Sequence, residues 1–334
     1  MEKPLRCLVA SSALVAALHA CAQDPQLSQF YAAPLYLNPA LTGNTLQDRL
    51  GVNYRLQWPG TGPGFRTYAL SYDHREESLR SGFGAMVMQD RAGTTNLNFT
   101  QAAVSYSYEA RLNRRQAIRA GLRGAYTRRS YDPGEMLFAD QVIRDHAPVS
   151  VEATGLPDRS YWDFSGGLLY FTESYWGGVS FNHLNRPEQG FRQETGTRLP
   201  VRASVHGGYR FPLDNRSLRH SETIMTLSAH YKAQDQWDQL DIGGYVEHSP
   251  VTFGLWYRGL PGLKAYKPGY SNDDAVVAML GVRTKSQLRL VYSYDVTVSM
   301  LTPKSGGAHE VSLIYEWPKH SKNRRYRAVP CPKF

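Results

Sequence analysis

The chain has 334 residues, of which 38 are Lys or Arg and 29 are Asp or Glu, so that its formal net charge is +9. Beyond the amino terminus no apolar run approaches the roughly eighteen residues of a membrane-spanning helix, which excludes a protein that crosses a membrane with helices. A membrane β-barrel stays possible, because only alternate residues of its strands face lipid.

The first 22 residues have the features of an export signal. Lys3 and Arg6 form a short basic region, and an apolar region extends from Leu8 to Leu18. This apolar region is too short to span a bilayer as a helix, so residues 1–22 are predicted to be a cleaved signal peptide. An exported protein does not meet nucleic acid, and nucleic acid is therefore excluded as a partner.

Two cleavage sites are compatible with this signal. Cleavage after Ala22 follows the small-x-small pattern, whereas the sequence ending at Cys21 resembles a lipobox and would leave a lipidated cysteine. Cleavage after Ala22 removes Cys7 and Cys21 and leaves Cys331 as the only cysteine. No intrachain disulfide is then possible, although the compartment would permit one.

Residues 23–48 lack the alternation of a strand and contain several prolines, which interrupt the hydrogen bonding of a sheet. We expect a non-strand segment here. Three placements are open for it: as a plug in the lumen of a barrel, along the periplasmic rim, or paired with another protein.

Period-2 alternation of apolar and polar residues recurs from residue 49 to residue 317. Tyr68, Leu70 and Tyr72, for example, alternate with Ala69 and Ser71. Such alternation places one face of a strand on an apolar medium and the other on a polar one, as in a soluble sandwich or in a membrane barrel.

Strand length and aromatic content favour the barrel. The runs 115–130 and 222–234 exceed the usual five or six residues of a sandwich strand and suit tilted transmembrane strands. The chain also has 22 Tyr and 6 Trp, many near strand ends, as expected of girdles at two membrane interfaces.

We therefore predict an all-β protein whose residues 49–317 form an antiparallel transmembrane β-barrel of about fourteen strands. An open edge cannot face lipid, so the last strand must pair with the first. An even strand number places both termini on one side, which we expect to be the periplasm. The expected strands are 49–58, 66–74, 81–90, 98–110, 115–130, 160–172, 175–184, 198–211, 222–234, 238–248, 250–259, 274–285, 286–298 and 307–317.

Residues 318–334 form a basic tail beyond the last strand. Six Lys or Arg and no acid lie in the last sixteen positions. The tail is either a solvated segment or a periplasmic contact for an acidic partner or for lipid headgroups.

The sequence contains no recognisable catalytic, metal or cofactor motif. His74, His183 and His309 lie at separate strand ends, and no Gly-x-Ser-x-Gly elbow is present, so hydrogen bonding in the lumen or at the rim is the better interpretation. No zinc-ligand spacing occurs. The glycine pairs 166–167, 177–178, 207–208 and 243–244 indicate bends, bulges or close approach of a plug segment.

Several short motifs follow one another along nearly the whole chain after the signal. They are Asp24-Pro25-Gln26-Leu27-Ser28-Gln29-Phe30-Tyr31, Tyr36-Leu37-Asn38-Pro39-Ala40-Leu41-Thr42-Gly43, Asn53-Tyr54-Arg55-x-Gln57-Trp58-Pro59-Gly60, Gly178-Val179-Ser180-x-x-His183-Leu184, His309-Glu310-x-Ser312-Leu313-x-Tyr315 and Cys331-Pro332-x-Phe334. In their order and spacing these motifs resemble the PorP/SprF family of the type IX secretion and gliding machinery. A departure is Leu27, where an aromatic residue is common in the family.

This resemblance implies a non-enzymatic outer-membrane barrel that anchors or helps export surface adhesins and binds periplasmic components of the secretion system. A passive porin or a barrel for hydrophobic solutes is the alternative, and an outer-membrane hydrolase is a more distant one. Membrane lipid is the other expected partner. The residues predicted to bind partners are Asp24, Pro25, Gln29, Tyr31, Asn38, Pro39, Arg324, Arg325, Cys331 and Phe334.

Overall fold

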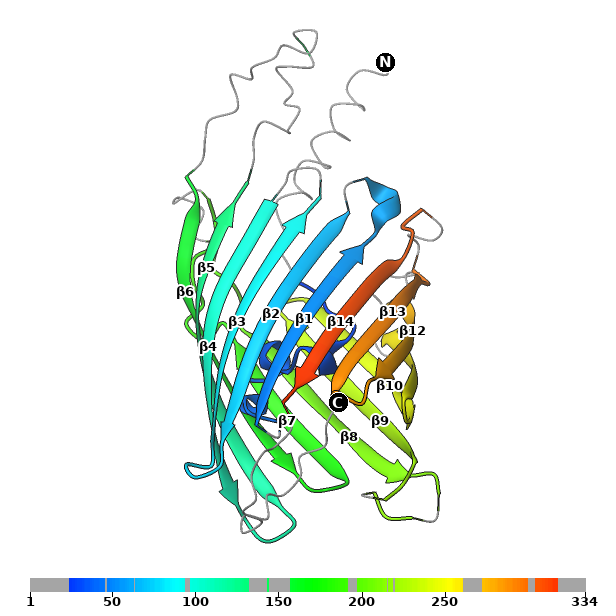
Figure 1. The fold of residues 1–334 in the computed structure, drawn as a ribbon. Helices are drawn as coiled ribbons and strands as arrows, with labels where there is room; N and C mark the ends of the chain where they lie inside the picture. The colour runs from blue at the N-terminus through cyan, green and yellow to red at the C-terminus, as the bar shows by residue number, and fades with distance from the viewer. Residues whose placement is uncertain are drawn as a thin grey trace.

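The computed structural model describes residues 24–45, 47–62, 64–93, 97–131, 143, 157–191, 197–214, 216–218, 220–260, 272–299 and 304–317. Within these residues fourteen antiparallel strands form one closed barrel (Figure 1). Each strand pairs with its neighbours in the chain, and the first pairs with the last over the register from Arg49–Glu316 to Gln57–Ala308. The predicted fold class and the predicted closure are confirmed.

The strands are between 8 and 15 residues long, as tilted transmembrane strands require. Their bounds are β1 Asp48–Gln57, β2 Phe65–Glu76, β3 Ser81–Ala92, β4 Leu97–Arg111, β5 Ala117–Ser130, β6 Arg159–Phe171, β7 Tyr175–Asn182, β8 Arg202–Pro212, β9 Thr223–Gln234, β10 Trp237–His248, β11 Val251–Gly259, β12 Asp273–Arg283, β13 Leu288–Thr297 and β14 Ala308–Glu316.

Most predicted bounds lie within two residues of the observed ones, and β8 is the clearest exception. It was expected to begin at residue 198 but begins at Arg202. The preceding residues are paired elsewhere, because Arg198 forms a bridge with Glu188 and the Leu199 amide donates to the Pro187 carbonyl at 2.8 Å. The connection between β7 and β8 thus folds back on itself before the strand begins.

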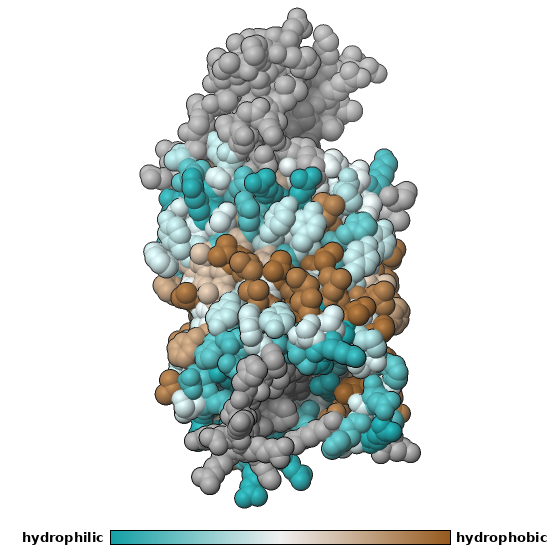
Figure 2. Space-filling model, in the orientation of Figure 1, coloured by the Kyte–Doolittle hydropathy of each residue, from teal (hydrophilic) through white to brown (hydrophobic). Residues whose placement is uncertain are grey.

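The barrel wall separates apolar from polar side chains residue by residue. In β2, Leu70 is 50% exposed on the outside, whereas Ala69 and Ser71 are buried on the inside. Figure 2 shows the result on one face of the molecule, a hydrophobic band across the middle with more polar surface above and below it. A band of this kind is the surface that a bilayer core covers.

Aromatic residues lie toward both ends of the wall. Tyr126 and Trp162 contact each other near one end, with ring centroids 5.3 Å apart, and Tyr315 and Trp317 lie 4.7 Å apart near the other. Their amphipathic rings suit the two interfaces between lipid and water.

The lumen contains the segment 24–45, called the plug below. It consists of three short helices, η2 (Phe30–Ala32), α2 (Pro34–Leu37) and η3 (Pro39–Leu41), which are visible inside the barrel in Figure 1. Prolines begin the second and third, where the missing N–H costs no hydrogen bond. No helix in the described residues is long and apolar enough to cross a membrane.

The plug runs from one end of the barrel to the other. We call the end with the connections after β1, β3, β5, β7, β9, β11 and β13 the loop end, which is uppermost in Figure 1, and the opposite end the turn end. Asp24 lies toward the loop end beside His183, whereas the Trp317 amide donates to the Asp48 carbonyl at the turn end. The two ends of the described chain therefore do not share one barrel end, and which membrane side each terminus faces stays a prediction.

Candidate functional site: the plugged lumen

The predicted partner-binding residues of the opening segment all belong to the plug. Gln29, Tyr31 and Asn38 are at most 6% exposed, and Pro39 is buried. Asp24 and Pro25 are partly exposed and line a cavity described below. The remaining predicted residues, Arg324, Arg325, Cys331 and Phe334, lie outside the described residues.

The beginning of the plug is bound to the seam where β1 and β14 meet. The backbone amides of Ser28 and Gln29 donate to the two carboxylate oxygens of Glu310 in β14, at 2.7 and 3.0 Å. The Gln29 side chain also donates to Ser293 in β13 at 2.9 Å. Glu310 in turn pairs with Arg55 of β1 at 3.1 Å.

The Ser28 hydroxyl lies at the centre of a buried charge cluster. It donates to Asp295 at 2.6 Å and accepts from Arg55 and Arg258, each at 2.6 Å. Both arginines also pair with Asp295, at 2.9 and 3.0 Å, and Arg258 pairs with Asp241 at 2.7 Å. Buried charges are tolerated when each is paired and hydrogen-bonded, and the plug supplies the hydroxyl that connects them.

Asn38 binds the opposite wall. Its side-chain nitrogen lies 3.2 and 3.1 Å from the carbonyl oxygens of Leu168 and Val179, and 3.0 Å from Nε2 of His206. Its side-chain oxygen accepts from the Ala40 amide at 2.8 Å and so caps η3. A single buried amide therefore joins the plug to β6, β7 and β8.

Asp24 forms an ionic contact near the loop end. Its carboxylate lies 2.8 Å from His183 and 2.7 Å from Arg202, and His183 also lies 3.0 Å from Asp163. Burial alone would lower the pKa of His183, but the two carboxylates outweigh it and raise that pKa to about 9. Burial works against the charge of Asp24, yet His183 and Arg202 hold its pKa well below the usual value.

Aromatic side chains hold the middle of the plug. Phe30 packs against Trp256 and His230, both with centroids 5.1 Å away, and Tyr31 stacks against Trp256. The Tyr31 hydroxyl contacts the sulfur of Met279.

The last residues of the plug are bound near the turn end. Ser107 of β4 donates to the Thr42 carbonyl at 2.7 Å, and the Gly43 amide donates to Asp73 of β2 at 2.8 Å. Asp73 is also paired with Arg49 at 2.8 Å.

Glycines in the wall allow the plug backbone to come close. A Cβ on Gly121 of β5 would lie 2.3 Å from the backbone of Pro39 and Ala40, and one on Gly167 of β6 would lie 2.0 Å from Asn38 Oδ1. Close approach was one of three expectations for the pair 166–167, and it holds at Gly167. Gly121 was not singled out in the sequence, because an isolated glycine in a strand has no distinguishing signal.

Together these contacts reach every strand of the barrel. Polar contacts join the plug to β1, β2, β4, β6–β9 and β11–β14, and close packing joins it to β3, β5 and β10. The plug therefore extends across the lumen and contacts the barrel wall on all sides.

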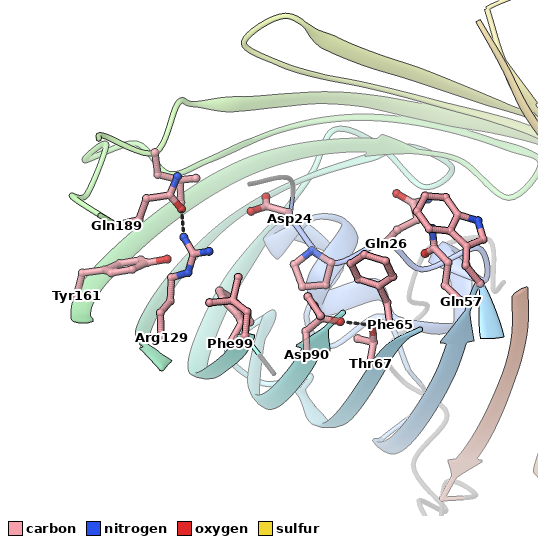
Figure 3. A pocket seen from close by; sticks show the side chains of 15 residues that line it. Asp24, Gln26, Gln57, Phe65, Thr67, Asp90, Phe99, Arg129, Tyr161 and Gln189 are labelled. Carbon is pink, nitrogen blue, oxygen red and sulfur yellow. Dashed lines mark hydrogen bonds between the residues drawn. The ribbon is translucent and has the colours of Figure 1, made fainter. Parts of the chain in front are cut away.

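A cavity of about 370 Å³ lies between the plug and the wall toward the loop end. We call it the vestibule (Figure 3). Sequence reasoning missed it, because its residues come from segments far apart in the chain. They are Asp24, Pro25, Gln26, Gln57, Trp58, Phe65, Thr67, Asp90, Ala92, Leu97, Phe99, Arg129, Tyr161, Gln189 and Leu199.

The histidines considered as catalytic candidates are hydrogen-bonded at the rim and in the lumen. His74 lies 2.8 Å from Asp48 and His309 lies 2.8 Å from the Tyr292 hydroxyl, while His183 has the carboxylate partners given above. Within the described part of the chain, no three His, Cys, Asp or Glu residues are grouped so as to hold a metal ion.

Comparison with solved structures gives other membrane barrels at low identity. The CymD monoaromatic hydrocarbon channel is 12% identical with a TM-score of 0.48, over 87% of this chain and 94% of that one. The toluene transporter TodX of P. putida is 12% identical with a TM-score of 0.47, over 85% and 93%. The KdgM porin is 8% identical with a TM-score of 0.39, over 81% and 99%.

Among curated proteins none is significantly similar to the chain. The family model of the type IX secretion system membrane protein PorP/SprF, in contrast, matches residues 20–315. This match includes the plug and nearly the whole barrel, so the resemblance seen in the short motifs is confirmed. The chain belongs to the PorP/SprF family of type IX secretion system membrane proteins.

Proposed function

We propose that this barrel is a non-enzymatic outer-membrane component of type IX secretion that anchors surface adhesins, or assists their export, by binding partner proteins. Membership of the PorP/SprF family supports the link to the secretion system. The contacts of the plug support the mode of action, because a filled lumen suits a protein that acts through its surfaces.

The observation that carries this proposal is the engagement of all fourteen strands by the plug. A porin requires a water-filled channel through the barrel. Here Asn38 at one wall and Ser28 at the other fix the plug across the lumen with buried hydrogen bonds. A passive porin or a hydrophobic-solute barrel is therefore the weaker alternative.

The first experiment measures conductance and partners on the same preparation. We would purify the tagged protein from native outer membranes in mild detergent, identify co-purifying proteins, and reconstitute the barrel in planar bilayers. We expect a stoichiometric surface protein or periplasmic secretion component and no steady conductance. A barrel that purifies alone and conducts ions would overturn the proposal and leave the porin.

We place the periplasmic contact on the basic tail that follows β14. Replacing Arg324 and Arg325 by Gln should reduce recovery of the periplasmic component, because an acidic partner loses two cationic contacts. The matched control is the replacement of Arg114 and Arg115 by Gln, an exposed pair in the turn between β4 and β5 at the turn end. Equal recovery with both double variants would exclude the tail as the binding surface.

The plug residues stay candidates for partner binding if the plug can leave the lumen. Asn38 and Gln29 contact the barrel in this structure, so a second protein would reach them only after the plug leaves the lumen. A cysteine at position 38 that reacts with a thiol reagent only in the presence of the secretion partner would support such release. A cysteine there that stays protected in the complex would confine the plug to a structural role.

A further inference from the structure

The vestibule contains two charged groups of opposite sign that form no ion pair with any residue that the structure describes. In the described part of the chain no ion pair involves Arg129 of β5 or Asp90 of β3. Arg129 donates to the side-chain oxygen of Gln189, and Asp90 accepts from the Thr67 hydroxyl at 2.6 Å. Both contacts are drawn in Figure 3. They differ in this from Arg55 and Arg258 beside the plug, which pair with Asp295.

Arg129 has spare hydrogen-bonding capacity as well as spare charge. It is only 8% exposed, and its Nε has no hydrogen-bond partner. A buried guanidinium that is neither ion-paired nor fully hydrogen-bonded is costly. A carboxylate entering the vestibule would satisfy both deficits, since Arg binds carboxylates through parallel N–H donors.

The two charges lie in one row across the sheet. Asp90 is the register partner of Phe99, and Phe99 is the register partner of Arg129. Two strand spacings separate the charged residues, so their Cα atoms lie about 10 Å apart. Phe99 occupies the position between them on the same inner face, as Figure 3 shows. A ligand in this row would have an anionic end, an apolar middle and a cationic end.

The remaining lining suits a polypeptide. Phe65 and Tyr161 add apolar surface, while the side-chain amides of Gln57 and Gln189 offer donors and acceptors of the kind that pair with peptide groups. Pro25 of the plug lines the same cavity. A volume of about 370 Å³ lies within the normal range of small ligand sites.

We propose that the vestibule binds a short peptide segment that presents a carboxylate to Arg129 and a basic group to Asp90, with an apolar residue on Phe99. The segment is expected to come from a partner protein at the loop end of the barrel. Only this source rests on the function proposed above, whereas peptide binding by the isolated barrel does not.

The test is isothermal titration of the purified full-length protein with two tripeptides whose termini are blocked by acetyl and amide groups. Lys-Val-Glu carries both charges, and Gln-Val-Gln has the same shape without them. We expect Lys-Val-Glu to bind at least about tenfold more tightly, since charged hydrogen bonds are roughly twice as strong as neutral ones. Equal affinities, or no saturable binding up to about 10 mM, would overturn the proposal.

Variants assign the charges to their residues. Arg129→Gln and Asp90→Asn should each weaken Lys-Val-Glu binding about tenfold and leave Gln-Val-Gln unchanged, and Arg129→Lys should fall between wild type and Arg129→Gln. The matched controls are Arg128→Gln and Asp158→Asn, an exposed ion pair on the outside of the barrel, which should not change binding. Unchanged affinity in Arg129→Gln would exclude the site.

Two further measurements, of folding and of partner recovery, distinguish a failure of the peptide site from a failure of the proposed function. Heat-modifiable migration in gel electrophoresis verifies that each variant is a folded barrel, and Arg129→Lys keeps the charge if Arg129→Gln does not fold. Peptide binding without any secretion partner in native membranes would contradict the proposed function and leave the site intact. If the partner is recovered equally with wild type and Arg129→Gln and no peptide binds, the peptide site is contradicted and the proposed function stands.

Discussion

Gly167 and Asn38 lie in such close contact that a Cβ on the glycine would be 2.0 Å from the Asn38 side-chain oxygen. The two residues are 129 positions apart in the chain. Asn38 fits against the wall because Gly167 has no side chain. The amide of Asn38 can then reach the carbonyl oxygens of Leu168 and Val179 on two neighbouring strands.

The first prediction follows from this pair. Gly167→Ala should displace Asn38, loosen the plug and allow ions through the lumen, at a cost of about 1–3 kcal/mol in the free energy of unfolding for overpacking. Single-channel conductance and thermal unfolding are the measurements. Gly166→Ala is the control, because a Cβ there would be no closer than 3.6 Å to any neighbour. Similar behaviour of the two variants would contradict the explanation.

The second prediction concerns the Ser28 hydroxyl. Ser28→Ala removes a hydroxyl that contacts Arg55, Arg258 and Asp295 together. We expect a loss of about 1–3 kcal/mol in unfolding free energy, since buried partners are left without a hydrogen bond. Urea unfolding measures the loss. Ser286→Ala, in an exposed turn, serves as control and should unfold like wild type.

The third prediction is a pH dependence of the plug contact near the loop end. His183 has a raised pKa of about 9 against an ordinary value of 6.5, so its contribution to stability is complete below pH 6.5 and is lost as the pH rises through 9. Asp24 has a lowered pKa, so its contribution is complete above its ordinary value of 3.8 and is lost as the pH falls further.

The two contributions together give a plateau of stability between about pH 4 and pH 6.5 and a decline on the alkaline side. Thermal unfolding midpoints measured from about pH 5 to about pH 10 would show this decline. In His183→Gln the alkaline decline should be smaller. If this variant and wild type lose stability in parallel up to pH 10, His183 is not the group responsible.

The fourth prediction tests the hydrophobic band. Leu122 of β5 is 67% exposed on the outer face, where lipid would surround it. Leu122→Lys should cost about 2–4 kcal/mol when folding is measured in lipid vesicles. Leu112, which is 56% exposed in the turn after β4, is the control, because Leu112→Lys places its charge beyond the band and should have little effect. Equal costs would mean that the membrane does not surround Leu122.

The sequence was sufficient for the wall of the barrel but not for its contents. Alternation such as Tyr68, Leu70 and Tyr72 reports which face of a strand meets lipid, and this local property locates strands. Contacts inside the lumen depend instead on the register of strands that are distant in the chain. The contact between Arg55 and Glu310, for example, can be predicted only when the register of the β1–β14 pair is known, because this register places the two residues opposite each other.

The plug illustrates the same limit. Its prolines correctly indicated a segment without strands. The density of family motifs drew attention to Asp24, Gln29 and Asn38 as partner-binding residues, and that role stays a prediction. The motifs did not indicate that these side chains would contact the barrel of the same chain, because a polar residue in a sequence motif does not show whether its partner is internal or external. The vestibule was missed for a related reason, since Asp90 and Arg129 become neighbours only through the strand between them.

The position of the plug inside a closed ring has a consequence for assembly. Strands β1 and β14 must meet although Arg55 and Glu310 are 255 positions apart, and closing so long a loop has an entropic cost. Ser28 forms hydrogen bonds with both residues. A plug that is already folded would therefore hold β1 and β14 close together before the hydrogen bonds between these two strands form. The segment would then act during biogenesis as an internal template, built into the barrel that forms around it.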